Sequence, residues 1–498
     1  MTGLGITLGS GESVEKFNLL EEPWIPVLKD GQVYQVSLGE ALLEAHTIAR
    51  IETASPLEEA ALHRLLLALL HRALPPVRDE QDAADLLDGG QFDQGALQSY
   101  LDRYHPRFWL FHPEAPFFQI ADLPEEEPVP WTKLRPELAG GNNPTLFDHS
   151  TDESPVKIPY AEAARALVVH QSFALGGLLR RLGVTSGKDA PLARAAVFLP
   201  TGETLFETLV LNLVPYEGED DKPLWEVPPL KQKDVENGAT KWALSGVTRV
   251  YTWPSRGVRL LDEGDGVRYM GYGPGVEPLP VIFRDPMVAY RTDAKGTIFP
   301  LRLSEERSFW RDFGTMLPSA GGTLPGTLRH AGAVGLEVGR AHRLRVLGQV
   351  SDQAKVLDAR REVYPLPSAL LLPQGALALE AALGKAERLG EALRSVAWRV
   401  ARGVLGDKDA KELEAFVRSL PLLRSYWASL DLAFPELLEA LSQPNALDTW
   451  RLRLRQAALR AWEETRLFVG TEGRHLAALA EGERALTFAL KELEEVSA

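Results

Sequence analysis

The chain has 498 residues, a formal net charge of −15 and no cysteine, with 45% apolar and 25% charged residues. These values are ordinary for a globular protein of roughly two or three domains. The lack of cysteine excludes disulfides, thiolate metal ligands and cysteine nucleophiles, and it favours a reducing, cytoplasmic setting. No apolar run reaches the ~18 residues that a membrane span needs, so we expect no membrane partner. The negative charge argues against coating nucleic acid through bulk charge.

The N-terminal segments predict a short leader followed by a strand and helices. Residues 1–16 are expected to be a flexible leader, because they lack the basic end and apolar stretch of a signal peptide. The segment FNLLEEPWIPVL, residues 17–28, predicts a strand with a proline-bounded turn. Residues 55–74 predict a strong helix that Ser55 can cap, and its nearly all-round apolar content is typical of a central core helix. Residues 84–104 predict a weaker helical region.

The middle of the chain mixes loop and strand patterns. Residues 122–159 combine proline, glycine, asparagine and acids, as a long functional or disordered loop does. The apolar, β-branched segment 205–215 predicts a buried strand. Two further segments predict β-hairpins, residues 258–272 with a turn near 264–266 and residues 281–303 with a turn at 293–296.

The composition changes near residue 365, where a segment rich in Ala, Leu, Glu and Arg begins. Between residues 379 and 400, apolar residues recur at spacings of three and four, which places them on one helix face. We therefore expect a four-helix bundle over residues 366–498 and a large mixed α/β domain over residues 17–365. The predicted fold class is α+β.

Common enzyme motifs are absent from the sequence. It has no His-Glu-x-x-His pair and no G-x-S-x-G elbow. The segment GVTSGKD is similar to a phosphate loop, but three residues separate Gly183 from Gly187, where the Walker pattern has four. Asp189 follows Lys188, and its charge would repel phosphate. We therefore expect a binding subunit without catalytic residues, metal or cofactor, and an unrecognised hydrolase is the least supported alternative.

Two basic segments stand out on this acidic chain. Between residues 171 and 194, four basic residues face one acid, and between residues 329 and 362 seven basic residues face four acids. Each segment is either a solvated face or a local contact for an anionic partner.

The segments FNLLEEPWIPVL, SPLEEAALHRLLLALLHR and FWLFHPEAPFFQ, together with the helical C-terminal part, resemble the CasA family over roughly residues 17–498. CasA is the large subunit of Cascade, the type I-E CRISPR surveillance complex. The resemblance implies an α/β domain of unusual topology followed by a four-helix bundle. It also implies a non-catalytic subunit, one copy per complex, that recognises the protospacer-adjacent motif (PAM) in double-stranded target DNA. Such a subunit helps open the duplex for R-loop formation with the guide crRNA and recruits a helicase-nuclease.

In the CasA family, a glycine-rich loop approaches the minor groove at the PAM. The resemblance aligns this loop with Ala174, Leu175, Gly176 and Gly177. This groove is only ~6 Å wide, so a backbone without side chains can enter it. A simple helix end at Gly176 and Gly177 is the alternative. Ala174 stands where the family has glycine. Contacts to DNA phosphates would come from Arg180, Arg181 and Lys188.

Two further DNA contacts follow from the resemblance. A hairpin-tip glutamine that wedges beneath the PAM aligns with Gln353, beside Asp352, and Lys355 would support it through a phosphate contact. A polar turn is the alternative explanation for Gln353. A lysine that reaches the minor groove aligns with either Arg291 or Lys295.

The remaining expectations concern RNA and protein partners. A Phe-Val-Asn motif of the family, in a loop near the PAM and the crRNA 5′ end, falls on Phe147, Asp148 and His149, where only the aromatic residue is kept. Arg451 and Arg455 would contact the displaced strand or a small Cascade subunit, although surface salt bridges explain them equally well. The alternative to DNA reading is a scaffold that contacts only other Cascade proteins.

Overall fold

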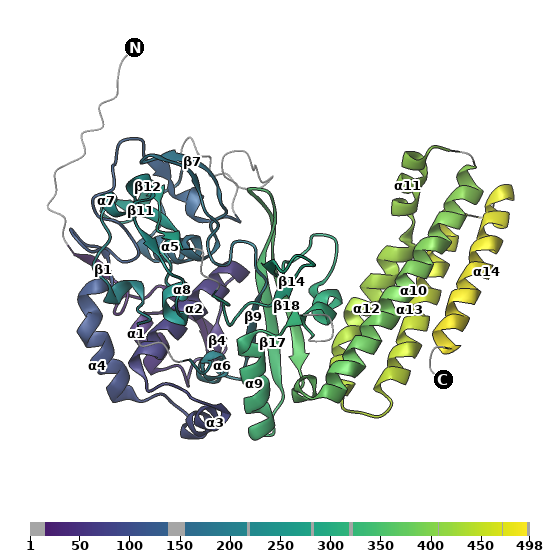
Figure 1. Ribbon diagram of the computed structural model, residues 1–498, viewed down its shortest axis with the longest axis horizontal. Coiled ribbons are helices and arrows are strands. Elements are labelled where there is room, and N and C mark those ends of the chain that lie inside the picture. Colours follow the sequence, from purple (N-terminus) through teal and green to yellow (C-terminus); the bar gives the residue numbers. More distant parts are fainter. Residues whose placement is uncertain are drawn as a thin grey trace, which may run out of the picture. The chain divides into compact units, whose positions relative to one another are not determined.

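The computed structural model describes residues 15–137, 155–216, 220–279, 283–317, 322–406, 408–470 and 472–495 (Figure 1). The chain divides into two compact units. The first unit comprises Met1–Glu306 and Thr323–Val363, and the second comprises Arg307–Gly322 and Tyr364–Ala498. Within the described residues, no helix has both the length and the apolar content needed to cross a membrane.

The N-terminal strands of the first unit belong to two small sheets. Strand β1 (Lys16–Asn18) pairs with β5 (Trp109–Phe111), whereas β2 (Ile25–Lys29) lies between β3 (Gln32–Val36) and β4 (Arg50–Ile51). Segment 17–28 therefore contributes to two strands of different sheets, where the sequence predicted one strand. The chain turns between them because the buried Asn18 and Trp24 side chains bond to the backbone of Leu20 and Leu19.

Helix α2 (Pro56–Ala73) is the core helix that the sequence predicted. The Ser55 hydroxyl caps it by accepting the amide of Glu58, and all of its residues from Pro56 to Leu70 are buried. The weaker helical region resolves into α3 (Glu80–Gly89) and α4 (Gln94–Tyr104), because Gly90 takes a left-handed conformation and ends α3.

Helix α6 (Leu205–Asn212) corrects the strand predicted for residues 205–215. Thr204 caps this helix by accepting the amide of Glu207. A short apolar run does not distinguish a buried helix from a buried strand by periodicity alone, whereas the threonine followed by a glutamate three residues later is a helix-start signal. Other helices of this unit include α1 (Leu38–Leu43), α7 (Gln232–Val235), α8 (Val247–Tyr251) and α9 (Gly326–Glu337).

Both predicted β-hairpins are present. Strands β11 (Arg256–Asp262) and β12 (Val267–Pro274) pair antiparallel, and β12 also pairs with β6 (Val129–Pro130). Strands β14 (Tyr290–Thr292) and β15 (Ile298–Pro300) form the second hairpin, and β14 also pairs with β16 (Gly322–Thr323). A short parallel pair joins β10 (Lys241–Trp242) to β13 (Glu277–Pro278).

The elements that carry the predicted site are one helix and two hairpins. Helix α5 (Tyr160–Phe173) leads into the small hairpin of β7 (Gly177–Arg181) and β8 (Val184–Gly187). The long hairpin of β17 (His342–Asp352) and β18 (Lys355–Leu366) joins a three-stranded sheet in which β17 pairs with β9 (Val197–Thr201).

The second unit is helical. It contains α10 (Pro373–Leu405), α11 (Ala410–Ser419), α12 (Pro421–Ala440), α13 (Ala446–Val469) and α14 (Gly473–Glu495). Helix α10 buries the face predicted from its spacing, including Leu379, Leu389 and Val400. The 3-10 helix Phe309–Met316 also belongs to this unit, and its Trp310 stacks on Phe434 at 4.7 Å between ring centroids. Together the two units confirm the α+β class.

Candidate nucleic-acid interface

The predicted glycine-rich loop lies between α5 and β7. Helix α5 ends at Phe173, so Gly176 and Gly177 do not end the helix: Gly177 opens strand β7 instead. Gly177 is exposed, whereas Ala174 is 3% exposed and packs with alanines 190 and 193. This corrects the DNA contact predicted for Ala174, because its side chain belongs to the core.

Backbone hydrogen bonds hold this loop in one shape. Ala190 donates its amide to the carbonyl of Ala174 at 2.9 Å, and the buried Arg256 guanidinium donates to the carbonyl of Leu175 at 2.9 Å. A Cβ on Gly176 would lie 2.9 Å from the amide nitrogen of Asp189, so only glycine fits there. Internal hydrogen bonds and close packing at Gly176 therefore define the shape of the loop.

Asp189 explains the segment that is similar to a phosphate loop. Its Oδ1 accepts the Gly176 amide at 2.6 Å, and its Oδ2 pairs with the Arg194 Nε at 2.7 Å. Residues 184–187 form strand β8, and the chain does not continue into the helix that a phosphate loop needs. Asp189, whose charge argues against a nucleotide site, thus stabilises the glycine-rich loop.

The second predicted element, Gln353, lies at the tip of the β17–β18 hairpin. Gln353 and Ala354 form the connection between the strands, and both are exposed. Gln353 has a φ of 50°, a left-handed conformation that hairpin turns usually give to glycine or asparagine. A Cβ on Gly177 would lie 3.6 Å from the Cβ of Ala354. The glycine-rich loop and the hairpin tip, far apart in sequence, therefore meet at the surface.

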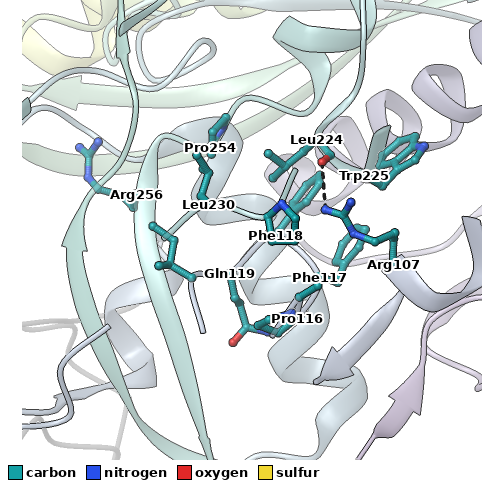
Figure 2. A pocket seen from close by; sticks show the side chains of 13 residues that line it. Arg107, Pro116, Phe117, Phe118, Gln119, Leu224, Trp225, Leu230, Pro254 and Arg256 are labelled. Atoms are coloured by element: carbon teal, nitrogen blue, oxygen red, sulfur yellow. Dashed lines mark hydrogen bonds between the residues drawn. The ribbon is translucent and has the colours of Figure 1, made fainter. Parts of the chain in front are cut away.

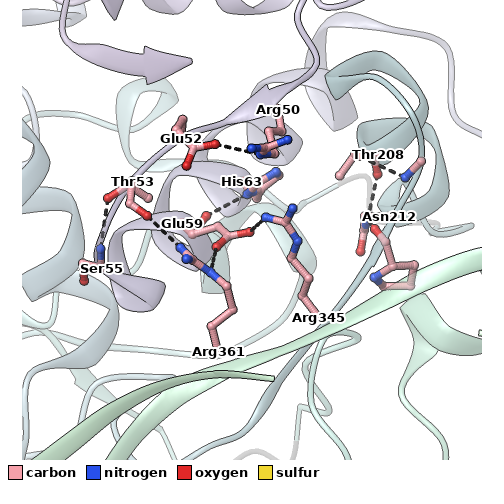
Figure 3. Close-up of polar contacts among 12 residues, drawn as sticks. Arg50, Glu52, Thr53, Ser55, Glu59, His63, Thr208, Asn212, Arg345 and Arg361 are labelled. Atoms are coloured by element: carbon pink, nitrogen blue, oxygen red, sulfur yellow. Dashed lines mark hydrogen bonds and ion pairs between the residues drawn. The ribbon is translucent and has the colours of Figure 1, made fainter. Parts of the chain in front are cut away.

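The base of the long hairpin is fixed to helix α2 (Figure 3). Glu59 of α2 is fully buried and pairs with Arg345 of β17 and with Arg361 of β18, whose Nε lies 2.6 Å from Glu59 Oε2. Arg361 also donates to the carbonyl of Thr53 at 2.7 Å. A buried carboxylate requires such partners, because an uncompensated charge in the core is strongly destabilising.

The middle of the hairpin is tied to the start of the glycine-rich loop. The buried Gln349 side chain of β17 donates to the carbonyls of Phe173 and Ala193, at 3.0 and 2.7 Å. The hairpin and the loop thus share one rigid support.

Three exposed cations lie on these elements. Arg180 and Lys188 belong to the small hairpin and its exit, and Lys355 opens β18. In the part of the chain that the structure describes, none of the three forms a salt bridge. Arg181 differs, because its Nη2 lies 3.7 Å from an oxygen of Glu127. The loop and tip therefore carry positive charge that an anionic partner can use.

In the described residues, no hydrogen bond or salt bridge links the other predicted residues to this surface. Arg291 lies on β14 and Lys295 in the turn that follows, both exposed, and neither hydrogen bonds to the loop or tip. In the helical unit, Arg451 pairs with Asp448 and Arg455 pairs with Glu494, each at 2.7 Å. Both arginines thus form the surface salt bridges that were the alternative. The predicted RNA-loop residues Phe147, Asp148 and His149 lie outside the described residues.

A small pocket, to which Arg256 contributes, is lined mostly by aromatic and apolar side chains (Figure 2). Its free volume is about 20 Å³, room for about one water molecule. Arg107 and Arg256 are the charged residues of its lining. Arg107 donates to the carbonyl of Val227 at 2.8 Å.

The sequence did not assign a role to several residues of this surface. Arg194 was one of the basic residues of its segment, and Asp189 was only an unsuitable phosphate-loop residue. The signal for Asp189 was its position after the lysine, where a nucleotide site needs a hydroxyl. Nothing in the local pattern pointed to Arg256 or Glu59.

The comparisons identify the class of protein as a CRISPR-associated protein. Residues 18–461 match the family described as CRISPR-associated protein Cse1. The chain therefore belongs to the Cse1 family, which is the CasA family that the sequence resembles.

Relatives cover nearly the whole chain. The CRISPR-associated protein CasA/Cse1 of Thermus thermophilus is 61% identical, over 97% of this chain and 99% of its own length. A solved structure of Thermus thermophilus CasA (Cse1) has a TM-score of 0.90 and 59% identity, and covers 96% of this chain and 100% of that one. The Cse1 crystal structure from Acidimicrobium ferrooxidans has a TM-score of 0.78 and 26% identity, over 96% and 98% of the two chains.

Proposed function

We propose that this chain is the non-catalytic large subunit of a CRISPR RNA-guided surveillance complex, present in one copy beside the other Cascade subunits. It reads the PAM in double-stranded DNA and begins to open the duplex, so that an R-loop forms with the crRNA. It then recruits the helicase-nuclease. Its family membership supports the complex, and one feature of the surface supports DNA reading.

That feature is the contact between the exposed Gly177 and the exposed hairpin tip at Ala354, 3.6 Å apart as measured from the Cβ position of the glycine. A slim backbone segment fits the narrow minor groove, and a neighbouring amide side chain can fill the gap left when a base pair separates. Leu175, Gly176 and Gly177 would face the groove, and Gln353 with Asp352 would form the wedge. Phosphate contacts would come from Arg180, Arg181, Lys188 and Lys355.

The proposal includes further contacts. Arg291 or Lys295 would reach the minor groove from the β14–β15 hairpin. Phe147, Asp148 and His149 would lie near the crRNA 5′ end. Arg451 and Arg455 would have to exchange their present salt bridges for the displaced strand or a small subunit.

The wedge is tested by removing the Gln353 amide in the assembled complex. Gln353→Ala and Gln353→Gly should both slow R-loop formation on a PAM-bearing duplex by at least about tenfold, because separating a base step costs a few kcal/mol. Initial duplex binding should change much less. The glycine variant relieves the left-handed backbone at this position, so a loss in both variants is not a folding effect. Unchanged R-loop formation would refute the wedge.

The groove contact is tested by Gly177→Asp, which adds bulk and negative charge to the loop. Affinity for PAM-bearing duplexes should fall by at least about tenfold, while affinity for duplexes without a PAM should change little. Gly89→Asp, at an exposed position with nothing within 4 Å, is the matched control and should behave as the parent chain. An equal loss on both kinds of duplex would exclude PAM readout at Gly177.

A scaffold that contacts only proteins is the competing function. It predicts that both loop and tip variants assemble and bind DNA as the parent does. ATP turnover by the purified chain would instead favour an enzyme.

A further inference from the structure

Arg194 connects the glycine-rich loop to the hairpin tip. Its Nε lies 2.7 Å from Asp189 Oδ2, and its Nη2 donates to the backbone carbonyl of Gln353 at 2.7 Å. Asp189 in turn accepts the amide of Gly176 at 2.6 Å. A continuous chain of hydrogen bonds therefore runs from the amide of Gly176 through Asp189 and Arg194 to the backbone of Gln353.

The geometry requires an arginine. The planar guanidinium presents donors in a fixed fork, so one side chain can bond a carboxylate and a carbonyl in different directions. Lysine carries the same charge as a single point on a flexible stem, and it does not reproduce two directed bonds. The substitution Arg194→Lys therefore keeps the positive charge and removes the two directed hydrogen bonds.

The bridge contributes little to holding the fold together. The side chains of Arg194 and Asp189 are 22% and 40% exposed, and partly exposed ion pairs contribute little to stability. The hairpin is fixed independently, by Glu59 at its base and by Gln349 in its middle. Loss of Arg194 should therefore leave the fold intact and release only the tip.

The bridge acts on a residue with an unusual backbone. Gln353 has a φ of 50°, and a non-glycine residue keeps such a conformation only when its surroundings hold it. Arg194 fixes the carbonyl of Gln353, and Ala354 lies next to Gly177. Gly177 belongs to the glycine-rich loop, and Arg194 is linked to that loop through Asp189. The orientation of the Gln353 side chain therefore depends on the position of the loop.

We propose that Arg194 is a positioning residue that joins the groove-reading loop and the wedge into one preorganised element, so that seating the loop in the groove places Gln353 at the first base pair to be opened. This inference rests on the proposed function, because it assigns a common action to the two contacts proposed there.

The first experiment uses the chain without DNA. Hydrogen exchange should be faster at the amide of Gly176 and at the hairpin tip in Arg194→Lys than in the parent chain, while the base of the hairpin stays protected. Arg259→Lys is the matched control, because Arg259 also bridges a carboxylate, Glu125 at 2.8 Å, and a backbone carbonyl, that of Leu123 at 3.1 Å. It should leave exchange at the loop and tip unchanged. Unchanged exchange in Arg194→Lys would overturn the proposal.

The second experiment uses the assembled complex and a PAM-bearing duplex. Arg194→Ala and Arg194→Lys should slow R-loop formation to a similar extent, about tenfold, with normal assembly and with Arg259→Lys as the control. If Arg194→Lys opens DNA as the parent does, the residue supplies only charge and the proposal is wrong.

The failure of this inference differs from the failure of the proposed function. If Gln353→Ala and Gly177→Asp impair opening and binding but both Arg194 variants do not, the positioning role is wrong and DNA reading stands. If Gln353→Ala and Gly177→Asp have no effect, DNA reading is wrong, and the joint action of loop and wedge is overturned with it.

A double-substitution cycle measures the coupling itself. In the parent background, Gly177→Asp and Gln353→Ala should together cost less than the product of their separate fold-losses, because each disables the same element. In the Arg194→Ala background the two losses should multiply. Independent losses in the parent background would also overturn the proposal.

Discussion

The two ends of the long β17–β18 hairpin are both held by a carboxylate paired with arginine, and they differ in burial. At the base, Glu59 is fully buried between Arg345 and Arg361. At the tip, Asp189 is 40% exposed and pairs with Arg194 alone. Because a buried charge without its partner is far more costly than an exposed one, the base serves stability and the tip can serve function. The predictions below test this difference.

The largest effect is expected at the base. Glu59→Ala leaves Arg345 and Arg361 facing a cavity without their counter-charge, and should lower the free energy of unfolding by about 3–5 kcal/mol. Denaturant unfolding of the full chain measures this change. Glu44→Ala, which removes an exposed pair with Lys29, should cost less than about 1 kcal/mol. A small effect of Glu59→Ala would show that the base is not the stabilising end.

Acid should weaken the same core. Burial lowers the pKa of His63, beside Glu59, and lowers the pKa of His330 to about 4. The unfolded chain takes up these protons below about pH 6.5, while the folded chain does not. Stability should therefore be unaffected by these groups above pH 6.5 and should fall as the pH is lowered below it, for His330 down to about pH 4 and by up to ~1.4 kcal/mol per pH unit.

Unfolding midpoints measured across this range test the acid effect. His330→Gln can keep the polar contact to the carbonyl of Val210 without titrating. It should make the free energy of unfolding depend less steeply on pH. If the pH dependence of stability is unchanged in this variant, groups other than His330 cause the loss of stability in acid.

An intermediate effect is expected in the middle of the hairpin. Gln349→Ala leaves the carbonyls of Phe173 and Ala193 without their donor and should cost about 1–3 kcal/mol. Gln98→Ala removes an exposed amide that bonds to Asp102, and it should be nearly neutral. Thermal unfolding of both variants compares a buried amide with an exposed one.

The smallest effect on stability is expected at the tip. Asp189→Asn keeps an oxygen for the Gly176 amide and removes the ion pair with Arg194, so unfolding should change by less than about 1 kcal/mol. A loss comparable to that of Glu59→Ala would show that burial does not separate the two ends.

The strongly periodic elements of this fold were predictable from sequence. Helix α2, the buried face of α10 and the β11–β12 and β14–β15 hairpins follow from apolar spacing and turn residues, which act locally. Helix α6 was mistaken for a strand, because its apolar run is short and its cap was overlooked. Glu59 shows a different limit: an acid in the first turn of a helix is usually solvated, and its two arginines lie far along the chain.

The candidate surface was only partly predictable. The resemblance pointed to Gly177 and Gln353, but the approach of Gly177 to the hairpin tip at Ala354 depends on long-range packing that no local pattern encodes. Ala174 was misassigned because its burial is set by alanines 190 and 193, which follow it only after an intervening hairpin. Arg194 had no assigned role, because a bridge between two acceptors is visible only when both are in place.

The stretch Arg307–Gly322 has a practical consequence for dissecting the protein, because it belongs to the helical unit although the chain then returns to the first one. Trp310 and Phe313 insert their rings beside Phe434, and Trp310 donates its indole N–H to Asp431 at 2.6 Å. A fragment cut to begin at Tyr364 would lack these rings, leaving a hollow lined by Phe434 and Trp450 that invites aggregation. Expression of the helical unit alone therefore calls for a permuted or tethered design that supplies this stretch.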